Sequence, residues 1–327
     1  MKTTQPAKPS SRRTLSGAAA AATMLPLAIS LLGPAVDRVN RTQPSEEAQA
    51  SVEAKKKPKP KPSPNPNDSV HLTLGNPSDA TEDPGNEDNF LMVKDQYCLS
   101  YNNTNGGPNW VSWHLQASDI GDEERGDFHP DTTLPPDFKM VTKANYNGTK
   151  FDRGHICNSK DRTDTREDND ATFFMTNILP QAPDNNQGPW RILEDFERSL
   201  AQDGNELYIT AGAFGTGGTG GKGTPDNSID GGEINVPKIF WKVIVVLPMG
   251  DNDLKRIDAN TRTIAVCMPN KQGIRKQPWQ TFVTTIKNVE TASGLNLLSL
   301  VPAGPKQTLE TKRDSEGQGP ADTNPCQ

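Results

Sequence analysis

Short runs of hydrophobic and β-branched residues recur between residues 70 and 268 of this 327-residue chain, and clusters of Asn, Gly and Pro separate them. This alternation is typical of strands joined by turns. The run Ile239–Leu247 is almost wholly apolar, which indicates a central strand that is buried on both faces. We therefore expect strands at 70–74, 90–93, 97–101, 110–115, 206–211, 239–247 and 263–268.

One further segment has the spacing of a helix. It starts around Asn186 and carries Pro189 in the first turn, where a helix tolerates proline. Trp190, Leu193 and Leu200 then fall along one apolar stripe. The strands and this helix together predict an α+β fold, with a mixed, mainly antiparallel central sheet flanked by helices.

The N-terminal part of the chain differs in composition from the rest. A twin arginine, Arg12-Arg13, precedes a weakly apolar, alanine-rich stretch at 17–32, and this resembles a twin-arginine export signal. A short uncleaved membrane anchor is the alternative interpretation. The Lys/Pro-rich segment 51–68 favours a disordered, extended linker, or a basic arm that contacts nucleic acid or an anionic envelope.

This composition divides the chain into four parts. We expect an export signal with its following segment at 1–50, a linker at 51–68, a folded domain at 69–303 and a C-terminal tail at 304–327. The protein should accordingly be exported, to the periplasm or the cell exterior. No stable membrane partner is expected unless the N-terminal segment stays uncleaved.

Charge is distributed unevenly along the chain. Residues 1–68 hold 11 of the 35 Lys and Arg residues and 5 of the 41 acidic residues, which leaves 24 basic and 36 acidic residues, a balance of −12, for residues 69–327. A protein that wraps duplex nucleic acid normally offers a basic face to the phosphates. The acidic balance therefore argues against a stable nucleic-acid-binding module. It favours an enzyme with a transient contact at a small site where a metal ion supplies positive charge.

The four cysteines, Cys98, Cys157, Cys267 and Cys326, are widely spaced and form no Cys-x-x-Cys pair, so a structural zinc site is not expected. An even number of cysteines in an exported protein permits disulfides, and the sequence leaves their pairing open.

The strongest local signal is the string Asp-Arg-Gly-His at residues 152–155. Hydrolysis of a phosphodiester requires a base that activates water, positive charge on the phosphoryl oxygens and stabilisation of the departing oxygen. A histidine that is neutral near pH 7 can act as the base, and this makes His155 the first candidate.

Four other strings accompany it, at 109–113, 124–128, 176–181 and 185–195. Together they resemble the DNA/RNA non-specific endonucleases of the ββα-metal class, whose catalytic motif is also called a His-Me finger. The resemblance continues to about Pro302, so it covers essentially the whole folded region, and it is strongest to nucleases secreted by filamentous cyanobacteria. It implies a nuclease that hydrolyses DNA and RNA to 5′-phosphate and 3′-hydroxyl ends with one Mg²⁺, or with Mn²⁺ in its place.

The resemblance also implies a role for each residue around the metal. His155 is the general base, and Asn186 is the only direct protein ligand of the ion, through a carbonyl oxygen of the hard type that Mg²⁺ prefers. If residues 186–194 are helical, Glu194 lies about 12 Å along the axis from Asn186, so it should reach the ion through a bound water. An ordinary exposed helix glutamate is the alternative for Glu194.

The remaining candidates contact the substrate or support the site. Arg125 is the expected clamp on the phosphoryl charge. Asn177 orients either the segment that carries the base or a phosphate oxygen. Asp152 orders the water network or the loop that holds His155, while Arg153 is either a structural ion-pair partner or a phosphate contact. The chain departs from the family just after the motif, where Cys157-Asn158 replaces the more familiar Ala-Pro.

Two other functions remain open on these residues alone. One is a catalytically inactive envelope or nucleic-acid-binding protein on the same fold. The other is a phosphodiesterase that acts on small molecules, or a structure-selective nuclease. Because His155, Asn186 and Arg125 are all present, we expect an active enzyme with DNA and RNA as substrates. A protein inhibitor as a further partner stays open.

Overall fold

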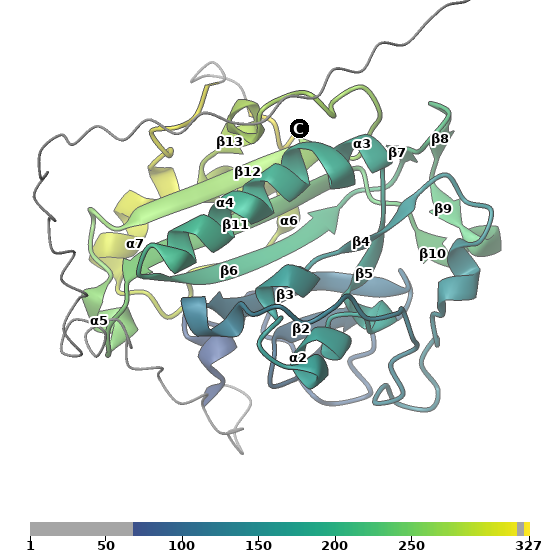
Figure 1. The fold of residues 1–327 in the computed structure, drawn as a ribbon, viewed down its shortest axis with the longest axis horizontal. Coiled ribbons are helices and arrows are strands. Elements are labelled where there is room, and N and C mark those ends of the chain that lie inside the picture. The colour runs from purple at the N-terminus through teal and green to yellow at the C-terminus, as the bar shows by residue number, and fades with distance from the viewer. Residues whose placement is uncertain (1–67, 319–323) are drawn as a thin grey trace, which may run out of the picture. The chain divides into compact units, whose positions relative to one another are not determined.

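The computed structural model describes residues 68–318 and 324–327. Its main feature is a seven-stranded sheet with the order β1-β2-β3-β6-β11-β12-β13, in which every neighbouring pair is antiparallel (Figure 1). The strands are β1 (Phe90–Val93), β2 (Cys98–Asn102), β3 (Gly107–Leu115), β6 (Asn205–Phe214), β11 (Ile239–Pro248), β12 (Arg262–Pro269) and β13 (Val283–Thr284). The predicted α+β fold with a mainly antiparallel central sheet is confirmed. The export signal and nearly all of the predicted linker lie outside the described residues.

The two faces of β11 enter two separate hydrophobic cores. The strand pairs with β6 on one side and β12 on the other, and its residues are buried from Ile239 to Leu247. Because side chains alternate along a strand, Phe240 and Ile244 enter one core and Trp241 enters the other. The prediction of a central strand buried on both faces is confirmed.

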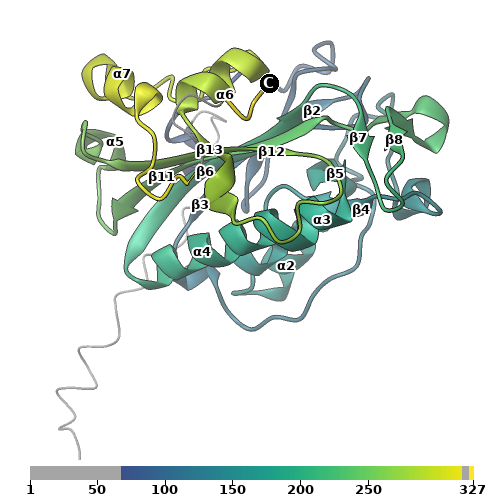
Figure 2. The same ribbon diagram turned by 90° about the horizontal axis from the view of Figure 1, so that it is seen from above.

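Helices cover both faces of this sheet (Figure 2). The described helices are α2 (Arg166–Ala171), α3 (Pro183–Asn185), α4 (Arg191–Gln202), α5 (Asp253–Arg256), α6 (Ile286–Ser293) and α7 (Ala303–Thr311). Leu193 of α4 packs into the first core, whereas Ile286 of α6 and Leu309 of α7 pack into the second. Helix α6 begins after Thr285, whose side chain accepts a hydrogen bond from the backbone N–H of Asn288, and it ends at Gly294 in the left-handed conformation.

Three small sheets complete the fold. They pair β4 (Asp152–His155) with β5 (Ile178–Gln181), β7 (Gly218–Thr219) with β8 (Pro225–Asp226), and β9 (Ser228–Ile229) with β10 (Ile234–Asn235). The β4–β5 pair sets Asp152 opposite Gln181 and His155 opposite Ile178, and α3 and α4 follow β5 along the chain. The motif string is therefore the first strand of a ββα unit.

The predicted strand at 70–74 is wrong, because residues Val70–Leu72 form a 3₁₀ turn. Ser69 starts this turn by accepting a hydrogen bond from the backbone N–H of His71. The His71 ring fixes it in place, since Nε2 donates to the carbonyl oxygen of Asp95 and Nδ1 accepts from the N–H of His114. A neutral ring with its proton on Nε2 satisfies both bonds. The other strand predictions are confirmed.

The helix predicted from Asn186 is interrupted in its first turns. Gly188 has φ −111° and ψ −118°, which are not helical values, and regular α-helix starts only at Arg191. A side chain at Gly188 would collide with the backbone of Arg275, because a Cβ there would lie 2.8 Å from the Cα of Arg275. Glycine therefore allows a second loop to approach this turn closely.

The cysteines divide into one disulfide and two free thiols. Cys267 of β12 is bonded to Cys326, which ties the end of the chain to the sheet, while Cys98 and Cys157 are free and buried. Within the described residues, no helix has the length and hydrophobicity that are needed to span a membrane.

A buried ion pair connects α4 to the sheet. Nζ of Lys242 on β11 lies 3.0 Å from Oε1 of Glu197, and both side chains are fully buried. The same ammonium lies 4.4 Å from the ring centre of Trp190 and 5.5 Å from that of Trp113. Two charges in such an environment are tolerated only as a pair.

Replacing Lys242 by Ala should therefore destabilise the fold by about 1 to 3 kcal/mol at pH 7, because the Glu197 carboxyl group, whose pKa burial raises to about 8, stays buried without its partner. Urea unfolding monitored by tryptophan fluorescence would measure this. The control is Lys238→Ala at an exposed lysine, which should change the free energy of unfolding by less than about 0.5 kcal/mol. Equal effects of the two substitutions would contradict the proposed importance of the pair.

Candidate active site

Residues from three separate stretches of the chain line one cavity of about 180 Å³. It lies where the end of β4 meets the start of α4. Arg125, His155, Asn186 and Glu194, which the sequence singles out, all line it. The complete lining is Arg125, Arg153, His155, Asn158, Ser159, Lys160, Asn186, Gln187, Arg191, Glu194 and Arg198.

His155 lies at the end of β4 with its ring buried between aromatic side chains. The ring centre is 4.8 Å from that of Phe173 and 5.2 Å from that of Phe128. Burial, and then the positive charge of Arg125, lower the pKa of His155 to about 3. The Nε2 atom is enclosed and has no hydrogen-bond partner among the described residues. A neutral ring that lines a polar cavity can accept a proton, as a general base must.

Asn177 lies behind the cavity and holds the chain segment that follows His155. Its side chain donates hydrogen bonds to the carbonyl oxygens of Cys157 and Thr172 and accepts one from the N–H of Cys157, each 2.9 Å long. The backbone carbonyl of Asn177 also accepts from the N–H of Ile156. Asn177 is fully buried. Of the two roles that the sequence leaves open, these contacts correspond to orienting the base segment.

Asp152 fixes the orientation of Asn186. Its Oδ2 atom accepts hydrogen bonds from Nδ2 of Asn186 at 2.9 Å and from Nε2 of Gln187 at 2.7 Å. Because the amide nitrogen of Asn186 donates to Asp152, the carbonyl oxygen is the atom of this amide that can bind a cation. Asp152 itself lines an adjoining cavity rather than the one that contains His155.

Glu194 is buried in the first full turn of α4, with 3 % of its surface exposed. Burial raises the pKa of its carboxyl group, while the charge of Lys242 and a hydrogen bond with the Asn158 side chain act in the opposite direction. The break at Gly188 means that the helical spacing assumed between Asn186 and Glu194 is wrong. Both side chains nevertheless line the same cavity.

Aromatic rings contact two arginines that line the cavity with His155. The guanidinium carbon of Arg125 lies 5.0 Å from the ring centre of Phe173 and 5.6 Å from that of Phe128, and that of Arg153 lies 4.9 Å from Phe128. Within residues 68–318 and 324–327, no carboxylate forms an ion pair with Arg125 or Arg153. Their positive charge is therefore available to a phosphate.

Arg198 is a candidate that the sequence reasoning missed. It lines the cavity, is 8 % exposed, and donates to Oδ1 of Asp161 at 2.9 Å. The signal that could have identified it is its position four residues after Glu194, which puts both side chains on one face of α4. Lys160 also lines the cavity and was not singled out by its sequence context.

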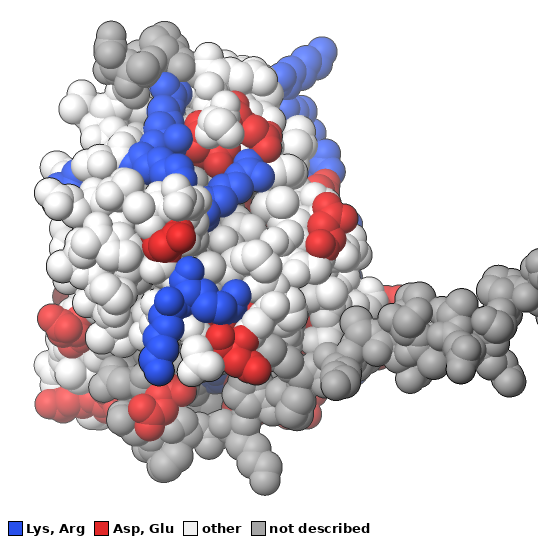
Figure 3. All heavy atoms as spheres, turned by 90° about the vertical axis from the view of Figure 1, so that its left-hand side faces the viewer, with Lys and Arg blue, Asp and Glu red and all other residues white. Residues whose placement is uncertain are grey.

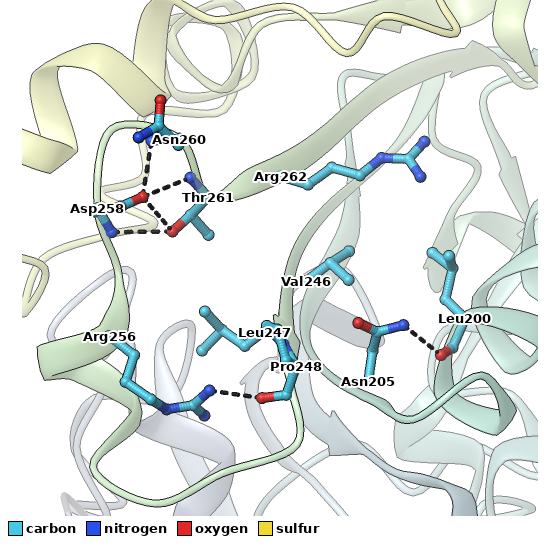
Figure 4. Close-up of a pocket in the computed structure, with 10 residues that line it drawn as sticks. All are labelled: Leu200, Asn205, Val246, Leu247, Pro248, Arg256, Asp258, Asn260, Thr261 and Arg262. Carbon is cyan, nitrogen blue, oxygen red and sulfur yellow. Dashed lines mark hydrogen bonds between the residues drawn. The ribbon is translucent and has the colours of Figure 1, made fainter.

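A larger cavity of about 580 Å³ lies at the other end of α4 (Figure 4). Its two arginines are both engaged: Arg256 lies 2.6 Å from carboxylate oxygens of Glu206 and Asp253, and Arg262 pairs with Asp314 and Glu316. The face of the molecule around α5 and α7 likewise mixes basic and acidic side chains (Figure 3). This end therefore does not offer the unpaired cations that distinguish the cavity around His155.

Comparison with known proteins identifies the family of the chain. Residues 74–304 match the family of DNA/RNA non-specific endonucleases. The chain is 46 % identical over 248 residues to a nuclease of Nostoc sp., covering 76 % of this chain and 87 % of that protein. It is 34 % identical over 221 residues to nuclease C1 of Cunninghamella echinulata, covering 65 % and 84 %.

More distant relatives share the fold. Human mitochondrial endonuclease G is 29 % identical over 211 residues, which cover 63 % of this chain and 68 % of that protein. A chain in the crystal structure of the EndoG/EndoGI complex superposes with a TM-score of 0.61 at 22 % identity, covering 77 % of this chain and 97 % of the other. The match over most of the described domain shows that the protein belongs to the DNA/RNA non-specific endonuclease family and is a nuclease, a hydrolase of phosphodiester bonds.

Proposed function

We propose that the protein is an exported endonuclease that hydrolyses both DNA and RNA without sequence preference, with His155 as general base and one Mg²⁺ as cofactor, or Mn²⁺ in its place. The products are 5′-phosphate and 3′-hydroxyl ends. The observation that supports this most strongly is that His155, Asn186, Glu194 and Arg125 line one cavity although they are far apart in sequence.

The donor atoms at this cavity fit a magnesium ion. Among the described residues, no group of three or more His, Cys, Asp or Glu side chains could hold a metal ion. The available donors are instead the carbonyl oxygen of Asn186 and the carboxylate of Glu194, both hard oxygen ligands. We infer that Asn186 is the direct ligand and that Glu194 anchors the ion indirectly. When bound, the ion supplies positive charge to the phosphoryl oxygens and the departing 3′ oxygen.

The other side chains of the site transfer the proton, bind the phosphoryl oxygens or position these groups. His155, neutral at physiological pH, takes the proton from the attacking water, while Arg125 binds the phosphoryl oxygens as their charge develops. Asp152 holds the Asn186 amide through the hydrogen bond described above. Asn177 acts as a positioning residue, because it fixes the backbone immediately after His155.

Export is supported by the disulfide as well as by the N-terminal sequence. The bond between Cys267 and Cys326 joins a buried strand residue to the end of the chain. Such structural disulfides form and persist in oxidising compartments, which for a bacterial protein are the periplasm and the cell exterior. We therefore propose that the segment containing Arg12 and Arg13 directs the protein out of the cytoplasm.

The central experiment is digestion of plasmid DNA and of RNA by the purified protein with Mg²⁺ or Mn²⁺. Both substrates should be degraded, and His155→Ala should lower the rate by at least about 100-fold, the usual effect of losing a general base. A matched control is His129→Ala, because the His129 ring bonds to the backbone of Asp170 and does not line the cavity. This variant should keep most of the activity.

Two results of the same assay would contradict the proposal. Undiminished cleavage in excess EDTA would show that the reaction does not need a metal ion. If the folded protein retains nucleic acid but does not cleave it, the result would instead support the alternative of a catalytically inactive nucleic-acid-binding protein.

The pH profile should reveal the unusual histidine. Because the pKa of His155 is lowered to about 3, the ring stays neutral at every pH above about 4. Between pH 7.5 and 5.5, kcat/KM should therefore fall by less than about threefold, whereas a base with the ordinary pKa of about 6.5 would lose about tenfold.

Glu194, with its raised pKa, is the other group in the cavity that could produce an acid limb. Measuring the pH profile of the residual activity of Glu194→Gln removes the contribution of this carboxyl group to the acid limb. A limb near pH 6.5 that persists in this variant would show that His155 titrates normally.

The export proposal has its own test. Residues 1–68 placed ahead of a reporter enzyme should carry it out of the cytoplasm, and changing both Arg12 and Arg13 to Lys should keep it inside, because a twin-arginine signal is read by a receptor. Reporter activity in the cytoplasmic and exported fractions measures this. Equal export of the two fusions would count against a twin-arginine route.

A further inference from the structure

Asn270 comes directly after strand β12 and lies next to the chain segment that leads to Asn186. The strand ends at Pro269, whose carbonyl oxygen accepts a hydrogen bond at 3.1 Å from the side chain of Asn185 in α3. The two residues are 84 positions apart in the sequence, yet the end of β12 reaches α3 (Figure 1). The central sheet therefore contacts the turn that carries the proposed metal ligand.

The side chain of Asn270 is buried and makes three hydrogen bonds to the backbone. Only 1 % of the residue is exposed. Its Oδ1 atom accepts from the N–H of Ala182 at 2.6 Å, and its Nδ2 atom donates to the carbonyl oxygens of Pro180 at 3.0 Å and Pro237 at 2.8 Å. Pro180 belongs to β5, and Ala182 follows that strand. One amide group therefore joins the ββα unit to the central sheet.

Ala182 connects this amide to the turn at residues 182–188, which carries Asn186. Its carbonyl oxygen accepts hydrogen bonds from the backbone N–H groups of Asn185 and Asn186, each 2.9 Å long. Asn270 thus holds the N–H of Ala182, and Ala182 in turn holds the backbone of Asn186. Ala182 is the N-cap of α3, where alanine has no side-chain acceptor that could fix the start of a helix. The position of the turn accordingly depends on contacts from elsewhere in the chain.

The segment that follows Asn270 contacts the same turn a second time. Nε of Arg275 lies 2.9 Å from Oδ1 of Asp184, and Nη2 of Arg275 donates to Oε1 of Gln187 at 3.1 Å. Asp184 precedes Asn186 in the chain and Gln187 follows it. The segment after β12 therefore holds the turn on both sides of the proposed metal ligand.

Asn270 itself does not reach the reacting groups. It lines neither the cavity that contains His155 nor the adjoining cavity that contains Asp152. Any effect of Asn270 on the reaction must therefore pass through Ala182. Asn186 is in this way fixed from two directions, its side chain by Asp152 and its backbone by Ala182. The first contact sets the orientation of the amide group, and the second sets the place of the residue.

We propose that Asn270 is a positioning residue for the metal site: through Ala182 it sets the place of Asn186, whose carbonyl oxygen is the proposed ligand. This inference rests on the metal-binding role of Asn186 in the proposed function. Loss of the Asn270 side chain frees the turn to move relative to β4, so the carbonyl oxygen is held less firmly where the ion binds. Groups that orient a metal ligand typically change metal affinity by about 10- to 100-fold.

The test measures binding of Mn²⁺ to the purified protein without substrate, from the electron paramagnetic resonance signal of free Mn²⁺. In Asn270→Ala the dissociation constant should rise by at least about tenfold, because the turn loses its contact with the sheet. The Mn²⁺ concentration that gives half-maximal plasmid cleavage should rise by the same factor, and it provides the measurement if binding without substrate is too weak to detect. Cleavage at saturating Mn²⁺ should fall by a smaller factor.

Ala182→Pro removes the same hydrogen bond from the other side, and it replaces Asn270→Ala if that variant does not fold. Ala182 has φ −61°, the value to which proline is restricted, and the residue before it ends a strand, as proline favours. The substitution removes the N–H that donates to Asn270. The dissociation constant for Mn²⁺ should therefore rise as it does in Asn270→Ala.

Two further substitutions separate positioning from stability. Asn270→Asp keeps the oxygen that accepts from Ala182 but loses the amide donor, so it should lower the melting temperature and still bind Mn²⁺ within about threefold of the native protein. Asn76→Ala is the matched control, because the Asn76 amide makes two hydrogen bonds to the backbone of Ala80 and lines neither cavity. It should lower the melting temperature without changing the affinity for Mn²⁺.

Unchanged Mn²⁺ affinity in the folded Asn270→Ala and Ala182→Pro variants would overturn the positioning role. An affinity that simply follows the melting temperature across all four variants would overturn it as well. These failures differ from failure of the proposed function. If the native protein binds no Mn²⁺ and cleaves in excess EDTA, the metal role is wrong and the positioning role is wrong with it. If the native protein binds Mn²⁺ and the variants bind it equally well, only the positioning role is wrong.

Discussion

One carboxylate oxygen joins the two halves of the candidate site. Oδ2 of Asp152 accepts hydrogen bonds from the amides of both Asn186 and Gln187, so β4 is fastened to the turn that leads into α4. His155 lies on the same strand as Asp152, and Glu194 lies on the helix that follows the turn. The relative positions of the proposed base and the proposed metal ligands therefore depend on this short bridge between strand and turn.

The site reconciles an acidic domain with a polyanionic substrate. The charge balance of residues 69–327 is −12. Arg125 and Arg153 are nevertheless not neutralised by ion pairs within the described part of the chain, because they contact the rings of Phe128 and Phe173 and not carboxylates. An aromatic ring can position a guanidinium without neutralising it. A small, locally positive site results, and a broad basic groove is not needed.

The sequence predicted those parts of the fold that depend on long patterns. The six correctly predicted strands consist of apolar or β-branched runs, whereas 70–74 became a 3₁₀ turn because Ser69 offers the backbone a local hydrogen bond. Strand β4 could not be predicted in this way, since four residues of the type Asp-Arg-Gly-His show no alternation. The break at Gly188 depends on the approach of Arg275, a tertiary contact that no local pattern contains.

The candidate site was predicted mainly from the family resemblance, and its details come from contacts between segments. The pairing of Cys267 with Cys326, the position of Asn177 behind His155 and the presence of Arg198 in the cavity all depend on residues that lie far apart in sequence or on adjacent helical turns. Motifs indicate which residue types are present. They do not indicate which side chain reaches the cavity and which one supports it from behind.

The burial of neutral histidines has a consequence for the free energy of folding. His155 and His71 both have pKa values lowered to about 3 in the folded protein, whereas in the unfolded chain they titrate near 6.5. Between these values the unfolded state binds protons that the folded state does not, so each histidine reduces stability by up to about 1.4 kcal/mol for every unit of pH below 6.5. The burial that keeps the His155 ring neutral thus also makes the domain sensitive to acid, so its folded state should persist over a narrower range of pH than that of a domain without buried histidines.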